Sequence, residues 1–250
     1  MIARVRALVR AIDEDRAGRD GAALACTVAA LSLVSMEYLP ERTLMRALYR
    51  VHPELHSADW AGLLDLAAWI GVRVLGFFAL PALALWATGA RVRDQALGPI
   101  SARQLLPYAG LLALVLPCLA LASLRPEFVR YYPFYRAAGR SWLDLAAWEL
   151  LYALHFVALE FFFRGWWLTQ LRPRFGSTAV YVAMVPYCMI HFTKPLLEVV
   201  AAIPAGIVLG LLAMQARSIW GGALLHVAVA WTMDALALVQ SSGFPRQLTP

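Results

Sequence analysis

Apolar residues run through this chain in seven long stretches, separated by short polar or proline-rich segments. The stretches cover residues 22–38, 61–87, 105–124, 143–169, 177–192, 195–214 and 219–239. Because a helix of about 20 residues crosses the apolar part of a bilayer, the pattern predicts about seven membrane helices. The stretch 177–192 is short for a span, so we expect it to be tilted or to end at a polar cavity. Residues 1–20 mix five arginines with four acids and predict an amphipathic helix at the membrane surface.

Composition agrees with this pattern. The 250 residues are 61% hydrophobic and 15% charged, whereas soluble domains have about 45–50% apolar and about 25% charged residues. We therefore expect an all-α, polytopic transmembrane helix bundle whose main partner is the lipid bilayer. No basic face interleaved with aromatic residues is present, so nucleic acid is not an expected partner. The sequence leaves the oligomeric state open.

The spacing of the stretches suggests a division of the chain. The last four are joined tightly and the first three more loosely, so we interpret 143–240 as the functional core. Residues 1–142 form accessory membrane helices and 241–250 a tail. Lys194 is the single lysine among 22 basic residues. Such a preference for arginine is typical of a GC-rich bacterial genome, and we expect an integral protein of the bacterial inner (cytoplasmic) membrane.

Glu160 and Arg164 lie four residues apart in the apolar stretch 143–169. Each charge costs about 2.5–3.5 kcal/mol at the centre of a membrane helix, so intramembrane charges usually mark functional sites. Residues four apart share a helix face and can pair. The alternative interpretation is a salt bridge that only fixes helix packing.

Two histidines occupy later apolar stretches, and each has polar neighbours at helical spacing. Tyr187 precedes His191 by one turn, and Asp234 follows His226 by two turns. Lys194 and Glu198 form another pair four residues apart, at the start of stretch 195–214. We regard Tyr187, Lys194, Glu198 and Asp234 as supporting candidates, with an ordinary interfacial ion pair as the alternative for the lysine and glutamate.

One carboxylate and two imidazoles at one depth would suit two hydrolytic mechanisms. In the first, which we favour, Glu160 is the general base on a water and the histidines stabilise the oxyanion, with no cofactor. In the second, Glu160, His191 and His226 bind a divalent metal such as zinc, whose bound water attacks.

Together these motifs resemble the CAAX-protease and bacteriocin-processing (CPBP, or ABI) family of intramembrane proteases. Its first motif, E-E-x-x-x-R followed by Gly, is similar to Glu160-Phe-Phe-Phe-Arg164-Gly165. Its second, F-x-x-x-H, resembles the segment from Tyr187 to His191. Its third, H-x-x-x-N or H-x-x-x-D, is matched in part by His226. The resemblance implies catalytic roles for Glu160, Arg164, His191 and His226.

The sequence departs from the family pattern at two positions. Leu159 replaces the leading glutamate, which the family is thought to use as the base, and Ala230 stands where Asn or Asp is expected. We hypothesise that Glu160 takes over as base, with Glu198 as another candidate replacement, and that Asp234 substitutes for the residue missing at 230.

The resemblance implies an endopeptidase that cuts a membrane-anchored protein or peptide. Its substrate would be a CAAX-type protein, a leader peptide or a C-terminal sorting segment. Two alternatives remain. One is a catalytically inactive relative that acts as a membrane scaffold or binds a partner, which the replaced motif residues favour. The other is a small proton-coupled transporter.

Overall fold

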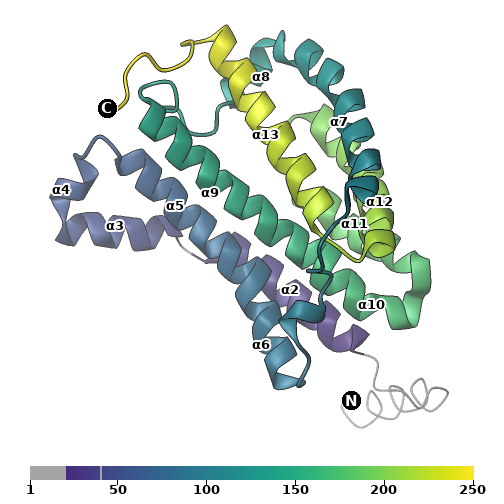
Figure 1. Ribbon diagram of the computed structural model, residues 1–250. Coiled ribbons are helices and arrows are strands. Elements are labelled where there is room, and N and C mark those ends of the chain that lie inside the picture. Colours follow the sequence, from purple (N-terminus) through teal and green to yellow (C-terminus); the bar gives the residue numbers. More distant parts are fainter. Residues whose placement is uncertain (1–20, 40) are drawn as a thin grey trace.

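Helices make up most of the computed structural model, which describes residues 21–39 and 41–250 (Figure 1). Within those residues there is no β-strand, and the one isolated bridge joins Leu97 to Ser218. The all-α prediction is therefore confirmed. The amphipathic helix predicted for residues 1–20 falls outside the described residues.

Some helical elements of the described chain follow one another directly, and the others are joined by turns or loops. The elements are α2 (Ala22–Tyr38), α3 (Glu41–Val51), α4 (Pro53–His56), α5 (Ala61–Val74), η1 (Leu75–Ala79), α6 (Leu80–Ala87), η2 (Val92–Asp94), α7 (Ala102–Ser123), α8 (Pro126–Tyr131), α9 (Trp142–Glu160), η3 (Phe161–Trp167), α10 (Leu168–Phe175), η4 (Gly176–Thr178), α11 (Ala179–Met189), α12 (Leu196–Ala216) and α13 (Trp220–Gln240).

The number of membrane spans differs from the predicted seven. Five helical stretches of the described chain are long and apolar enough to cross a bilayer, or six if α2 and α3 together form one bent span. The difference has two sources. The apolar stretches 143–169 and 177–192 belong to one helical run, Trp142–Met189, and α2 alone has 17 residues. The described chain therefore contains five or six candidate spans, and the count of seven is not confirmed.

Helices α9 and α13 lie side by side and antiparallel, and their pairing positions the candidate site (Figure 1). The contacts follow one register. Glu160 lies against Gly222, Phe156 stacks on His226, and Trp148 bonds to Asp234. The first step is four residues, or one turn, on both helices, and the second is eight residues, or two turns, so whole turns of α9 meet whole turns of α13.

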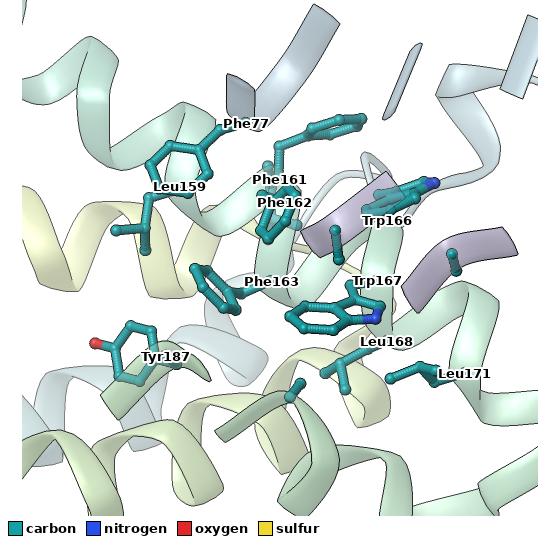
Figure 2. Packing of buried hydrophobic residues seen from close by; sticks show 14 of the residues in the cluster. Phe77, Leu159, Phe161, Phe162, Phe163, Trp166, Trp167, Leu168, Leu171 and Tyr187 are labelled. Carbon is teal, nitrogen blue, oxygen red and sulfur yellow. The ribbon is translucent and has the colours of Figure 1, made fainter. Parts of the chain in front are cut away.

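The π-helical segment η3 follows α9 and carries a run of aromatic side chains. Phe161, Phe162, Phe163, Trp166 and Trp167 are all buried, together with Phe77 from η1. Figure 2 shows these rings packed around one another, with Leu159 at one edge and Tyr187 of α11 at another. Aromatic rings bury a large apolar area, so this cluster anchors the segment that bears Glu160 and Arg164.

Helices α11 and α12 approach each other closely through two glycines of α12. A Cβ atom at Gly206 would lie 3.0 Å from Met184 Cγ and 3.1 Å from Tyr187 Cδ1, and one at Gly210 would lie 2.8 Å from Val180 Cγ1. Small residues at this spacing allow membrane helices to pack backbone to backbone. The contact holds Tyr187 against the aromatic cluster.

Candidate active site

Glu160 and Arg164 form the predicted ion pair, where α9 passes into η3. Arg164 Nη1 lies 3.1 Å from Glu160 Oε1, and the two side chains are 2% and 0% exposed. The guanidinium also lies over the ring of Tyr187, 4.0 Å from its centroid. The pair is thus fully enclosed, and its geometry alone is compatible with either a structural or a catalytic role.

His226 of α13 contacts the same carboxylate. Its Nδ1 lies 3.0 Å from Glu160 Oε1 and 3.2 Å from the carbonyl oxygen of Gly222. An ionised carboxylate and a carbonyl only accept hydrogen bonds, so Nδ1 carries the proton. In the neutral imidazole, Nε2 is then an acceptor, and it lies 3.0 Å from the Tyr187 hydroxyl. Glu160, His226 and Tyr187 therefore form a chain of polar contacts across three helices.

Gly222 makes room for the carboxylate and was not predicted. A Cβ atom at this position would lie 2.2 Å from Glu160 Oε2. No residue other than glycine fits without moving the acid. The available signal was a Gly-Gly pair at 221–222, one turn before His226 on the same helix.

His191 reaches the site through Tyr187. It lies in the turn after α11, where its Nδ1 bonds to the Tyr187 carbonyl oxygen at 2.8 Å and the two ring centroids are 4.8 Å apart. Because burial disfavours the charged imidazole, the pKa of His191 falls to about 4. His191 is therefore neutral at pH 7, with Nδ1 donating to the carbonyl and Nε2 left as an acceptor.

Lys194 and Glu198 form their predicted pair, at 3.3 Å, but in a separate cluster with Tyr132. The Tyr132 hydroxyl lies 2.8 and 2.9 Å from the two Glu198 carboxylate oxygens, and Lys194 Nζ donates to that hydroxyl at 3.2 Å. Burial raises the pKa of Tyr132, and nearby Tyr152 and Glu198 raise it further. Glu198 is thus held by the loop before α9 and makes no direct contact with Glu160.

Asp234 also lies apart from Glu160. It accepts a hydrogen bond from Trp148 Nε1 at 2.7 Å and is fully buried. Ala230, between Asp234 and His226, packs with Trp148 and Tyr152. Leu159 lies within the aromatic cluster of η3 (Figure 2). Asp234 therefore does not occupy the place of the Asn or Asp that the family pattern has at position 230. The residues around Leu159 are apolar, as is Leu159 itself.

The alternative metal site requires Glu160, His191 and His226 to converge. Among the described residues, no group of three or more His, Cys, Asp and Glu side chains has an arrangement that could hold a metal ion. Glu160 and His226 are in contact, whereas His191 bonds to the backbone carbonyl oxygen of Tyr187. These three side chains do not fit a metal as a ligand set, and we derive no step through one.

Comparison with known protein families gives a match for one segment of the chain. Residues 140–232 match the family described as type II CAAX prenyl endopeptidase Rce1-like. No curated protein and no solved structure matches the chain. The matched segment begins just before α9, ends within α13 and contains Glu160, Arg164, His191 and His226. The match confirms the resemblance predicted from the motifs: residues 140–232, which are 93 of the 250 residues, are similar to the Rce1-like members of the CAAX-protease and bacteriocin-processing family.

Proposed function

We propose that this chain hydrolyses a peptide bond in a membrane-anchored protein or peptide, at a site within the bilayer. The chain is an integral membrane protein with a segment from a peptidase family. The observation that carries the proposal is the chain of polar contacts from Glu160 through His226 to Tyr187. A carboxylate on one imidazole nitrogen and a proton donor on the other is an arrangement suited to general base catalysis.

The geometry favours His226 over Glu160 as the base. Glu160 is fully enclosed, and its carboxylate is occupied by Arg164 and His226. The side chain of His226 is 16% exposed, and its Nε2 points toward the hydroxyl of Tyr187. In this proposal Glu160 is a positioning residue that fixes the tautomer of His226 and offsets the charge of the imidazolium. Arg164 holds Glu160 in place.

The reaction then follows from the proton positions. A water donates one hydrogen bond to Nε2 of His226 and one to Nε2 of His191, both of which are acceptors. As the water oxygen attacks the carbonyl carbon, its proton moves to His226. The Tyr187 hydroxyl, released from His226, donates to the oxyanion. His226 returns the proton to the departing amide nitrogen as the C–N bond breaks, and the second proton of water stays on the new carboxyl group.

The substrate class follows from the setting and the family. The name of the family denotes endopeptidases that act on prenylated CAAX proteins. We propose a substrate anchored in the membrane and cut near its anchor: a CAAX-type protein, a leader peptide or a C-terminal sorting segment. Because a helix shields its own amides, the segment must unfold locally before cleavage.

The test is cleavage of quenched fluorescent, lipid-anchored peptides by the full chain reconstituted in vesicles. General acid–base catalysis contributes about 10²–10⁴-fold, so His226→Gln is expected to lower the rate by that factor. The matched control is His155→Gln, because His155 is also buried in the bundle but stacks on Trp69. Equal rates for the wild-type protein and His226→Gln would refute the proposed base.

A second candidate function is a membrane scaffold without peptidase activity. The specific observation in its favour is that Leu159 lies in an apolar cluster and Ala230 in a second one, at the two positions where the family carries polar groups. If this is correct, the reporters bind to the wild-type protein and to His226→Gln equally well and neither protein cleaves them.

A further inference from the structure

A pocket of about 240 Å³ lies between α10, the end of α12 and the segment that follows η2. Its lining consists of three arginines, one acid and several apolar or small residues: Asp94, Ala96, Arg164, Leu168, Thr169, Arg172, Ala213, Met214 and Arg217. Arg172 and Arg217 are exposed at its rim, whereas Arg164 is buried. Arg164 is thus shared between the lining of the pocket and the Glu160–Arg164 pair.

Arg164 has hydrogen-bonding capacity that the described residues do not use. It is 3% exposed, and neither Nη1 nor Nη2 meets the geometry of a hydrogen bond, although Nη1 lies 3.1 Å from Glu160. A guanidinium carries five N–H donors, and leaving buried donors unpaired is costly. Arg164 also lines the pocket, and because both nitrogens are buried, an acceptor in the pocket meets them when the guanidinium turns toward it.

The charge around the pocket is positive. Arg172 and Arg217 make no ion pair with any described residue, and Asp94 lies 3.8 Å from the neighbouring Arg93. The last carbonyl groups of α12 add partial negative charge, which is smaller than the charge of the rim arginines. The lining of the pocket therefore carries three guanidinium groups and one carboxylate, that of Asp94.

We propose that this pocket binds a phosphate group, held by Arg164 at its floor and by Arg172 and Arg217 at its rim. The planar fork of arginine matches the oxygens of phosphate, and basic pockets between membrane helices are known to bind lipid head groups. The volume is below the range of about 300–1,000 Å³ that holds whole drug-sized ligands, so a single head group fits. The phosphate comes either from an anionic lipid or from solution.

The test uses the full chain purified in a maltoside detergent, which contains no phosphate. Unfolding temperature is measured as inorganic phosphate is added, with sodium chloride keeping the ionic strength constant. Phosphate is expected to raise the unfolding temperature saturably. Arg172→Gln and Arg217→Gln are each expected to weaken the apparent affinity about fivefold. The matched control is Arg103→Gln, which removes an exposed arginine from the start of α7, outside the pocket.

A second experiment identifies the source of the phosphate group. Phosphatidylglycerol is added at the same mole fraction as a neutral glycolipid. If the lipid is the ligand, it raises the unfolding temperature and abolishes the response to inorganic phosphate. If free phosphate is the ligand, its response persists in the presence of lipid. The same response in wild type, both rim variants and Arg103→Gln, or no response in either experiment, overturns the proposal. Because the measurement needs no peptidase activity, the proposed phosphate site is tested separately from the proposed function.

Discussion

The buried ion pair between Glu160 and Arg164 makes a quantitative prediction about stability. The perturbations are Glu160→Gln, Arg164→Gln and the double variant. Each single change leaves one uncompensated charge in a space where the partners are 0% and 2% exposed. Removing one member of such a pair costs about 3–5 kcal/mol. The double variant removes both charges, so we expect it to lose no more stability than either single variant.

The assay is equilibrium unfolding in mixed micelles, followed by tryptophan fluorescence. The control cycle uses Lys194 and Glu198, whose side chains are 22% and 24% exposed at 3.3 Å. The coupling free energy between Lys194 and Glu198 is expected to be below about 1 kcal/mol because solvent screens the pair. If the stability losses of Glu160→Gln and Arg164→Gln simply add in the double variant, the reasoning is refuted. Peptidase activity is expected to stay lost in the double variant, because His226 still lacks its carboxylate.

Three further changes test other contacts of the site. Gly222→Ala places a Cβ 2.2 Å from Glu160 Oε2, so it should cost about 1–3 kcal/mol and most of the activity, measured by unfolding and peptide cleavage. Tyr187→Phe keeps the ring beneath Arg164 but removes the hydroxyl at Nε2 of His226, so kcat should fall with little change in KM. The pKa of His191, about 4, lies below its ordinary value of 6.5, so the unfolded chain binds more protons between these pH values and stability falls as pH is lowered through them. His191→Asn should remove that loss, about 3 kcal/mol, from the pH dependence of unfolding.

Matched controls exist for each of these. Gly110→Ala adds a Cβ with no atom within 4 Å and should not destabilise the protein. Tyr181→Phe removes a hydroxyl from an exposed ring on the same helix as Tyr187. His52→Asn removes an exposed imidazole. An effect of a control as large as that of its test variant would contradict the corresponding contact.

Local spacing predicted much of the architecture. The stretches 22–38 and 61–87 coincide with Ala22–Tyr38 and Ala61–Ala87, because runs of apolar residues mark a membrane helix directly. The pairs Glu160–Arg164 and Lys194–Glu198 formed because residues four apart share a helix face. Whether Glu160, Arg164, His191 and His226 carry catalysis is still a prediction.

Contacts between helices were harder to predict. Gly222 and Trp148 matter because of the register between α9 and α13, and one sequence holds no local signal for that register. Asp234 lies on the same helix as His226, two turns on, but the residue facing it on α9 is Trp148 rather than Glu160. The π-helical segment Phe161–Trp167 was also missed, since a stretch in which nearly every residue is apolar fits any helical period.

The close approach of Gly222 to Glu160 has a consequence for how this sequence can change over time. The acid and the glycine fit each other in size, so neither position can drift alone: alanine at 222 becomes acceptable only in a lineage whose acid has first been shortened or lost. Joint variation of the two sites, 62 positions apart in the chain, would then distinguish relatives that retained the buried carboxylate from those that abandoned it.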